Sequence, residues 1–268
     1  MQQVVFITGV SSGFGKKIAV LLADKGYIVY GTSRKDIDSD HAITVLKADV
    51  TDAASVKSAV DKVIMKEGRI DILINNAGMG ISGPIEEFSL EDVKLQMGTN
   101  VMGVFNTIQA VLPSMRRLQK GLIINVSSIG GLMGLPFQGF YSASKYAVEG
   151  LSEALRMELK QFKIKVVVIE PGDFSTNFTA NRKIIASGMT NSAYKEQFTK
   201  SLAIIEKDEK GGLPPEFLAK KILKIIESKC PCHRYVISTF EQKLAVCLKA
   251  VLPDGLFFKI LASHYGIK

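Results

Sequence analysis

The sequence contains few cysteines, no long apolar run and no secretory signal. Three of its 268 residues are cysteines, and Cys230 and Cys232, on either side of Pro231, are too close in the chain to form an unstrained disulfide. The most apolar late stretch, residues 244–262, is interrupted by lysines and by Pro253, so it is too short to span a bilayer. The N-terminus leads directly into a strand pattern. These absences predict a globular protein of a reducing, cytoplasmic compartment.

The chain also lacks a block of basic residues, although lysine and arginine are in excess. The formal net charge is +8, from 34 basic and 26 acidic residues scattered along the chain. This distribution suits an anionic ligand or an anionic membrane surface better than nucleic acid. The segment Cys230-Pro231-Cys232-His233 lacks the ligand spacing of a zinc site. We therefore expect neither nucleic-acid binding nor a bound metal.

Short apolar runs alternate with longer helical patterns. The runs are almost continuously apolar, which is typical of parallel strands buried on both faces. This order predicts an α/β fold over residues 1–268: a single doubly wound parallel sheet (Rossmann fold) with helices on both faces. The expected strands are residues 4–8, 27–33, 43–48, 70–75, 122–127, 165–170 and 234–238. The expected helices are residues 14–25, 52–67, 89–119, 141–162, 215–228 and 240–252.

Two segments depart from this alternation. Residues 173–213 lack a clean period, which predicts an excursion from the sheet that covers a substrate pocket. Residues 240–268 form a C-terminal amphipathic helical extension with apolar clusters and lysines. Three placements of this extension are open: over the pocket, against a second subunit, or on an anionic membrane. The expected partners are accordingly other copies of the chain, in a homodimer or homotetramer, and a membrane surface in peripheral contact.

A glycine-rich segment joins the first expected strand to the first expected helix. Its glycines allow a tight turn and close approach to a pyrophosphate, whose charge the helix N-terminus stabilises. The alternative is a turn made only for packing. The predicted dinucleotide site comprises Gly9, Ser11, Ser12, Gly13, Phe14 and Gly15.

The end of the second expected strand predicts which dinucleotide is bound. NAD-binding enzymes usually carry an acidic residue there, which repels a 2′-phosphate. This strand ends in Ser33-Arg34-Lys35, where hydroxyl and guanidinium groups suit that phosphate. NADP(H) is therefore the expected cofactor. The alternative is that Arg34 and Lys35 are solvated turn residues, and Asp36 and Asp38 follow closely enough to weaken the preference.

A hydroxyl, a phenol and an amine follow the fifth expected strand. Ser128 stands at the end of that strand, and Tyr141 and Lys145 come next on one helix. The spacing of Tyr141 and Lys145 places them on one helical face, where the ammonium favours the ionised phenol. Tyr141 is thereby predicted to be a usable acid or base.

As a set, these motifs resemble the short-chain dehydrogenase/reductase family in its compact branch. The resemblance extends from residue 3 to about residue 178 and also rests on Asn75-Asn76-Ala77-Gly78, Asn100 and Pro171-Gly172 followed by Thr176. It implies an NADP(H)-dependent enzyme that interconverts a carbonyl and a secondary alcohol.

The resemblance also implies the role of each residue. Tyr141 exchanges a proton with the substrate oxygen, and Ser128 orients that oxygen. Lys145 binds the nicotinamide ribose, and Asn100 holds a water that links Lys145 to solvent. The other implied cofactor contacts are Asp49 and Val50 at the adenine, Asn76, Ala77 and Gly78 at the adenine-side ribose, and Pro171, Gly172 and Thr176 at the nicotinamide.

Other functions fit parts of the pattern. The alternatives are a 3-oxoacyl-carrier reductase, which is usually shorter, and a non-catalytic dinucleotide-sensing regulator, which does not need the catalytic set. An extended-branch epimerase usually has a longer C-terminal domain. Apolar side chains in residues 129–137 and 174–198 predict a cavity for a bulky hydrophobic substrate. The loops and tail resemble relatives that act on steroids, retinoids or long-chain keto-lipids such as 3-ketosphinganine, and the choice among these is open.

Overall fold

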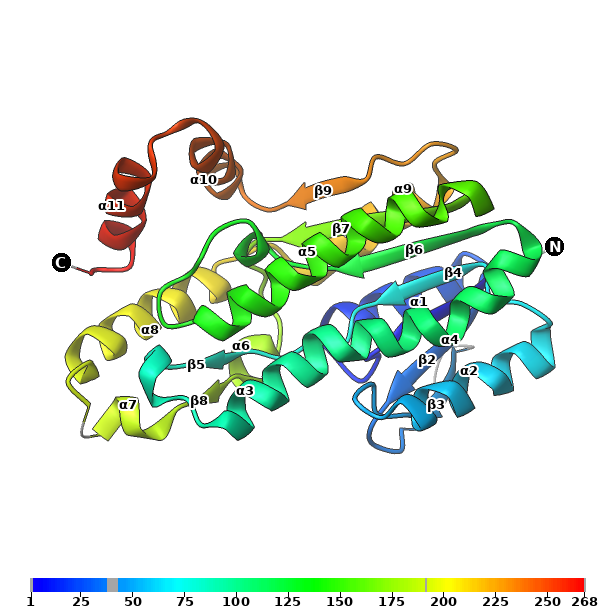
Figure 1. Cartoon of the computed structure of the whole chain (residues 1–268), viewed down its shortest axis with the longest axis horizontal. Helices are drawn as coiled ribbons and strands as arrows, with labels where there is room; N and C mark the ends of the chain where they lie inside the picture. The colour runs from blue at the N-terminus through cyan, green and yellow to red at the C-terminus, as the bar shows by residue number, and fades with distance from the viewer. Residues whose placement is uncertain (1, 38–42, 191, 268) are drawn as a thin grey trace.

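A twisted sheet of seven parallel strands forms the centre of the protein (Figure 1). The computed structural model of the chain describes residues 2–37, 43–190 and 192–267. The strand order is β3-β2-β1-β4-β6-β7-β9, and the predicted Rossmann fold is confirmed. The strands are β1 (Val4–Thr8), β2 (Ile28–Ser33), β3 (Ile43–Lys47), β4 (Ile72–Asn75), β6 (Gly121–Val126), β7 (Ile164–Pro171) and β9 (Arg234–Ile237).

Helices cover both faces of this sheet and create two apolar cores. On β1, Val5 and Ile7 face one core, while Val4 and Phe6 face the other, because successive strand residues point to opposite faces. The first core is closed by α1 (Gly13–Asp24) and α9 (Pro215–Glu227). The second is closed by α2 (Ala53–Glu67), α4 (Gly103–Leu118) and α5 (Gly139–Leu159). Burial on both faces explains why the strand sequences are continuously apolar.

The predicted helix over residues 89–119 is present, with an irregular turn inside it. The structure has α3 (Leu90–Met97), a π-helical turn at Gly98–Met102 and then α4. Such turns are frequent at functional sites, since they re-aim the side chains that they carry. Here the turn carries Asn100, whose side chain is buried.

The segment 173–213 leaves the sheet and has structure of its own. Its β8 (Lys183–Ile184) pairs in parallel with β5 (Ile81–Ser82). These two strands form a separate two-stranded sheet. Its helices are α6 (Phe178–Asn181), α7 (Ala186–Thr190) and α8 (Lys195–Lys210). Single 3-10 turns lie elsewhere, at Ile85–Glu87, Ile129–Gly131 and Lys160–Phe162.

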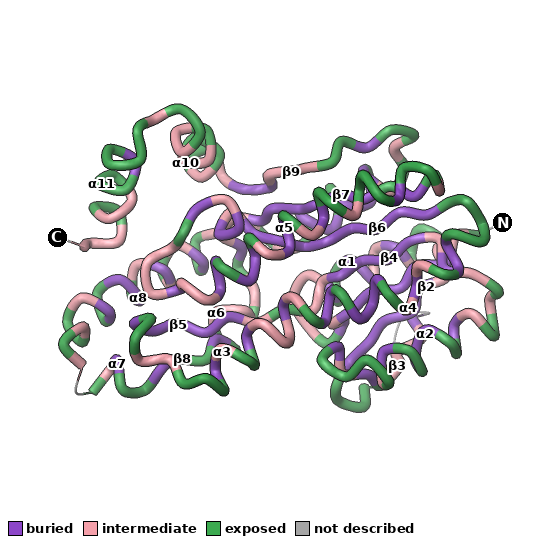
Figure 2. The backbone as a smooth tube through the Cα atoms, viewed as in Figure 1, coloured by how far each residue is buried: buried purple, intermediate pink, exposed green. Residues whose placement is uncertain are grey.

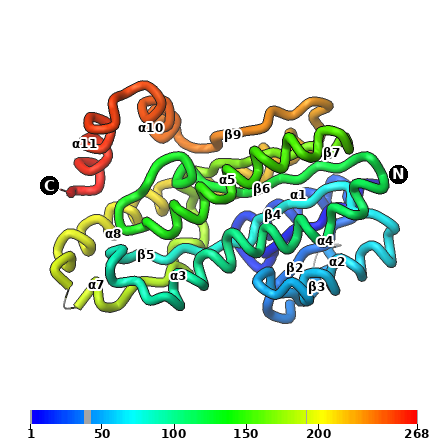
Figure 3. Tube along the Cα trace, viewed as in Figure 1, coloured from blue at the N-terminus to red at the C-terminus, as the bar shows by residue number. Residues whose placement is uncertain are grey.

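The C-terminal extension consists of α10 (Phe240–Val251) and α11 (Asp254–His264), which continue from β9 beyond the sheet (Figure 3). Both helices are largely exposed or half-buried, in contrast to the buried strands (Figure 2). The end of the chain contacts α8, because Ser201 donates a hydrogen bond to the Tyr265 carbonyl at 2.8 Å and His264 pairs with Asp208 at 2.9 Å. In the described part of the chain, no helix is long and apolar enough to cross a membrane.

Candidate active site

A cavity of about 1690 Å³ lies at the carboxyl edge of the sheet. It runs from the glycine-rich segment, past the ends of β2, β4, β6 and β7, to the inner side of α10 and α11. In doubly wound sheets, ligands bind at this edge, where the strand order reverses. In this sheet the reversal lies between β1 and β4.

The glycine-rich segment has the backbone that a pyrophosphate site requires. Gly9 and Gly13 have φ angles of 74° and 55°, in the left-handed region that favours glycine. A Cβ on Gly15 would stand 2.1 Å from the Gly9 carbonyl oxygen. The first turn of α1 begins at Gly13, and its N–H groups have no partner within the helix. Gly9, Ser11, Ser12, Gly13 and Phe14 line the cavity, so the segment fits a dinucleotide phosphate.

Asn76 fixes this segment from the neighbouring strand β4. Its side-chain amide donates to the carbonyls of Thr8 and Gly9 at 2.9 and 3.0 Å. The Thr8 hydroxyl accepts from the backbone N–H groups of Asn76 and Ala77, both at 3.0 Å. Asn76, Ala77 and Gly78 thus lie beside the glycine-rich segment and line the same cavity.

The end of β2 presents Ser33 and Arg34 to the cavity. Ser33 is buried and accepts a hydrogen bond from the Lys35 N–H at 3.1 Å, while Arg34 is exposed. Asp36 pairs with Lys47 at 2.7 Å. Asp38 lies outside the described residues. The nearby wall of the cavity is formed by Asp49 and Val50.

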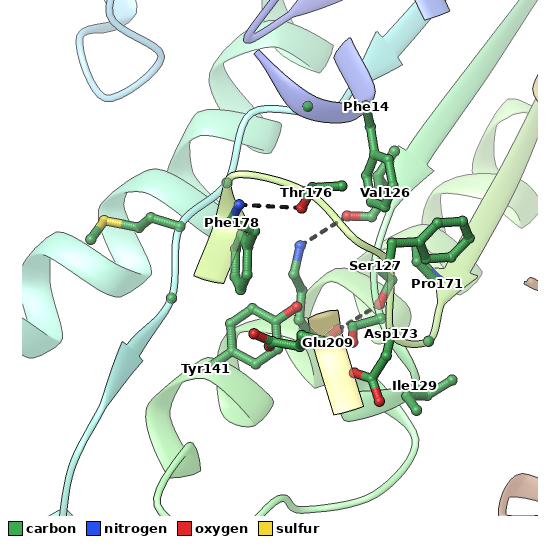
Figure 4. A pocket seen from close by; sticks show the side chains of 18 of the residues that line it. Phe14, Val126, Ser127, Ile129, Tyr141, Pro171, Asp173, Thr176, Phe178 and Glu209 are labelled. Atoms are coloured by element: carbon green, nitrogen blue, oxygen red, sulfur yellow. Dashed lines mark hydrogen bonds between the residues drawn. The ribbon is translucent and has the colours of Figure 1, made fainter. Parts of the chain in front are cut away.

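Ser128, Tyr141 and Lys145 meet where β6 ends and α5 begins, and Figure 4 shows Tyr141 there beside Phe178. The Lys145 ammonium donates to the Val126 carbonyl at 2.9 Å and lies 5.8 Å from the centre of the Tyr141 ring. The Phe178 ring packs on the Tyr141 ring with centres 5.8 Å apart. All three predicted side chains are thus brought together at the wall of the cavity.

Burial dominates the protonation of both groups. It raises the pKa of Tyr141 to about 12, although a hydrogen bond from the Ser128 hydroxyl opposes the shift. It lowers the pKa of Lys145 to about 8. The sequence predicted that Lys145 favours the ionised phenol. The structure shows the opposite shift for Tyr141, because removal from water disfavours the charged form of each group.

Asn100 lies close to Lys145 without a direct hydrogen bond to it. Its side chain accepts from the Met79 N–H at 2.9 Å and donates to the Met79 carbonyl and to the Ser144 hydroxyl, both at 3.0 Å. A Cβ on Gly78 would stand 3.4 Å from the Asn100 oxygen and 3.7 Å from the Lys145 nitrogen. The two side chains therefore flank one narrow space under Gly78.

Pro171 ends β7, and Gly172 and Thr176 follow it along the same wall, where Figure 4 shows Pro171 and Thr176. Gly172 donates its N–H to the Ile237 carbonyl at 3.0 Å, and a Cβ there would stand 2.0 Å from the Gln242 side-chain oxygen. The Thr176 hydroxyl accepts from the Phe178 N–H at 3.2 Å. All three residues line the cavity that begins at the glycine-rich segment.

This geometry agrees with comparisons to known proteins. A model of the family described as short chain dehydrogenase matches residues 3–184. The chain belongs to the short-chain dehydrogenase/reductase family. It is therefore an oxidoreductase that acts on carbonyl or alcohol groups with a nicotinamide dinucleotide.

Two relatives and one solved structure resemble the chain over nearly its whole length. It is 49% identical over 266 residues to a 3-ketodihydrosphingosine reductase of Bacteroides thetaiotaomicron, covering 99% of each chain. It is 34% identical to an NADPH-dependent 3-dehydrocapnine reductase of Ornithobacterium rhinotracheale, covering 95% of this chain and 94% of the relative. The crystal structure of a Streptomyces avermitilis short-chain dehydrogenase superposes with a TM-score of 0.81 at 28% identity, covering 97% and 98%.

The substrate end of this dehydrogenase/reductase differs from the sequence prediction. Phe174, Phe178, Ile129, Met133 and Leu135 line the cavity as expected. Several apolar residues expected there do not line it and belong to the region around the small sheet: Ile184, Ile185, Met189, Tyr194 and Phe198.

The sequence analysis missed the polar wall of the substrate end. Asp173, Glu209 and Gln242 line the cavity, and the Gln242 amide donates to the Asp173 carboxylate. A capping box of Thr239 and Gln242 opens α10, and this pattern is visible in the sequence. It predicts the start of the helix but not the contact across 69 residues with Asp173.

The burial of Lys145 generates a stability prediction. Because its pKa is about 8 instead of 10.5, the charge opposes folding by about 3 kcal/mol at pH 7. Replacing Lys145 by methionine removes this opposing free energy but also removes the hydrogen bond to the Val126 carbonyl, which offsets about 1 kcal/mol of the gain. Lys145→Met should therefore raise the free energy of unfolding by about 1–3 kcal/mol in urea titrations without cofactor.

The lowered pKa of Lys145 also determines how the stability of the fold changes with pH. Between pH 8 and 10.5 the unfolded Lys145 holds a proton that the folded form has lost, so the wild-type chain becomes more stable as pH rises. The advantage of Lys145→Met should shrink over that range. Lys62→Met, at an exposed position of α2, should change stability by less than about 0.5 kcal/mol. A destabilised Lys145→Met at pH 7 would contradict this account.

Proposed function

We propose that this protein reduces the keto group of a long-chain keto-lipid to a secondary alcohol with NADPH. The observation that carries the proposal is the buried Tyr141, beside Ser128 and Lys145, at the junction of a dinucleotide groove and an apolar chamber. The 3-ketodihydrosphingosine reductase, 49% identical over 99% of both chains, supports 3-ketodihydrosphingosine, the same compound as 3-ketosphinganine, as the substrate.

Tyr141 is the proposed proton donor of the reduction. With a pKa of about 12, the phenol holds its proton at neutral pH, as a general acid must. Tyr141 donates that proton to the carbonyl oxygen, which Ser128 orients by a hydrogen bond. The dinucleotide, when bound, supplies the hydride. Lys145 would bind the ribose hydroxyls, and Asn100 would hold a water for proton supply to Lys145.

The chamber beyond Tyr141 supports a long apolar chain. Its wall combines the loop after Ser128 with the C-terminal extension, through Ile129, Met133, Leu135, Leu244, Leu248, Phe257, Ile260 and Leu261. Such a wall suits an acyl chain, which gains free energy in proportion to the apolar area that it buries. A 3-oxoacyl-carrier reductase remains the alternative enzyme. A non-catalytic sensor would not need Tyr141, Ser128 and Lys145 to meet.

NADP(H) is the proposed dinucleotide. Ser33 and Arg34 line the groove where the 2′-phosphate would lie, and the ion pair of Asp36 with Lys47 reduces the repulsion from that carboxylate. The reductase of Ornithobacterium rhinotracheale is named as NADPH-dependent, which supports the same choice.

The surface supports two further proposals, self-association and peripheral membrane contact. Exposed apolar side chains on the π-helical turn, on α4 and on α5, namely Met102, Phe105, Leu118, Tyr146 and Met157, offer a face for a homodimer or homotetramer. A second group on α10 and α11, namely Phe240, Val251, Leu256 and Phe258, is also exposed and carries lysines between its members. We propose that this second face contacts an anionic membrane from the cytoplasm.

Tyr141→Phe tests the catalytic assignment. Removing the phenol hydroxyl should lower kcat for NADPH-dependent reduction of 3-ketodihydrosphingosine by about 10²- to 10⁴-fold, since a general acid contributes that factor. The dissociation constant for NADPH should stay within about threefold, because the aromatic ring is retained. The control is Tyr146→Phe, half-exposed on the same helix. More than about a tenth of wild-type turnover in Tyr141→Phe would exclude Tyr141 as the acid.

Arg34→Ala tests the choice of cofactor. Loss of a charged contact to the 2′-phosphate should weaken NADPH by about 1–3 kcal/mol, or roughly 5- to 150-fold, and leave NADH within about twofold. Fluorescence titration measures both dissociation constants. Arg117→Ala, an exposed arginine at the far end of α4, is the matched control. Equal losses for NADPH and NADH would refute the assignment.

Sedimentation tests the two surface proposals together. The wild-type chain should sediment with anionic phosphatidylglycerol vesicles at low salt, and Val251→Glu/Phe258→Glu should lose most of this binding, because carboxylates are repelled by the surface and oppose burial. Met65→Glu, at an exposed apolar residue on α2, is the control. Without vesicles, both forms should sediment as a dimer or tetramer. A double variant that is monomeric would instead assign this face to self-association.

A further inference from the structure

Two carboxylates lie beside the reacting phenol at the substrate end of the cavity. Asp173 follows Gly172 directly, and Glu209 comes from the last turn of α8. Figure 4 shows both carboxylates near Tyr141, and the charge of each raises the pKa of the phenol. Both are therefore within electrostatic range of the atom that would protonate the substrate.

The two carboxylates differ in how their charge is balanced. Glu209 is paired with the guanidinium of Arg182, a side chain that is 1% exposed, and accepts from the Thr179 hydroxyl at 2.6 Å. Asp208 precedes Glu209 in the chain, is less buried and is paired with His264. The Asp173 carboxylate accepts only a neutral amide hydrogen bond from Gln242 and makes no ion pair within 4.0 Å among the described residues, and Arg182, which pairs with Glu209, lowers the pKa of Asp173 only from a longer range. Its negative charge is the unpaired one.

The unpaired charge of Asp173 is held in place and faces the cavity. Its backbone N–H donates to the Gln242 side-chain oxygen at 3.2 Å while its carboxylate accepts from the Gln242 amide. Burial is the main cause that raises the pKa of Asp173 to about 6, and the carboxylate still carries its charge at pH 7. A desolvated charge without a counter-ion is costly in a folded protein. Its retention beside a reacting group is typical of a ligand-binding position.

We propose that the Asp173 carboxylate binds an ammonium group on the carbon next to the substrate's carbonyl. This inference rests on the proposed function, because it concerns the ketone that Tyr141 protonates. A cation bound there would supply the counter-charge that the described side chains do not supply to Asp173, by a charge-assisted hydrogen bond. 3-Ketodihydrosphingosine carries such an ammonium on the carbon adjacent to its ketone. Asp173 would thus select amino ketones over plain ketones and over β-keto thioesters.

Paired substrates test this role. The wild-type chain and Asp173→Asn would be assayed with NADPH on 3-ketodihydrosphingosine and on the same long-chain hydroxy ketone without its amine. The amide is nearly isosteric and still accepts from Gln242. Because hydrogen bonds to charged groups contribute about 1.5–3 kcal/mol, Asp173→Asn should lower kcat/KM for the amino ketone by roughly 10- to 150-fold. For the amine-free ketone the change should stay below about threefold.

A binding measurement separates recognition from catalysis. Dodecylamine should inhibit the wild-type chain competitively, and dodecanol should inhibit it less. Asp173→Asn should weaken inhibition by dodecylamine at least fivefold and leave dodecanol unchanged. Glu158→Gln, which removes an exposed carboxylate from the last turn of α5, outside the cavity, should behave as wild type throughout. The dissociation constant for NADPH verifies that each variant is folded.

The outcomes distinguish the two proposals. If the wild-type chain reduces both ketones equally well, or if Asp173→Asn lowers both activities by the same factor, the role of Asp173 is refuted while the reductase assignment stands. If the wild-type chain reduces neither ketone but reduces a 3-oxoacyl thioester, the proposed substrate class itself is wrong.

Discussion

The exclusion of water from the Tyr141–Lys145 turn is the constraint on which the site depends. Lys145 is held by the Val126 carbonyl at the end of β6, so the position of α5 is tied to the central sheet at the turn that carries Tyr141 and Lys145. Burial then favours the neutral form of both side chains. At neutral pH the Tyr141 phenol is therefore a hydrogen-bond donor, and the Lys145 amine can exchange a proton with solvent near that pH.

The rest of the fold arranges polar groups around that turn. Asn76 ties the glycine-rich segment to the end of β4, and Asn100 is turned toward Gly78 by a π-helical turn between α3 and α4. Each contact links neighbouring strands or helices at the same sheet edge. The site is therefore supported by strands on the side of the glycine-rich segment, whereas its other side is built from loops and from helices outside the sheet.

The sequence predicts the dinucleotide side of the site well and the substrate side poorly. Strands such as Val4–Thr8 are almost continuously apolar, and the glycine-rich segment between β1 and α1 has a recognisable spacing. The break at Gly98–Met102 is not visible as a change of helical period. Ile185 and Phe198 pack near β5 and β8, two strands of two residues each, too short to give a pattern. The contact between Asp173 and Gln242 joins distant segments, and no local propensity encodes it. The shift of the Tyr141 pKa follows from burial, which spacing alone does not reveal.

The two hydrogen bonds between Gln242 and Asp173 also connect the carboxylate proposed to bind the polar head with the helix proposed to line the acyl chain. The same helix α10 that holds the carboxylate by its first turn contributes Leu244 and Leu248 to the apolar wall. In the proposed complex, recognition of the polar head and accommodation of the acyl tail would therefore both depend on α10. Exchange of the C-terminal helices between relatives would transfer the apolar wall and Gln242, whereas the Asp173 carboxylate would stay with the end of β7.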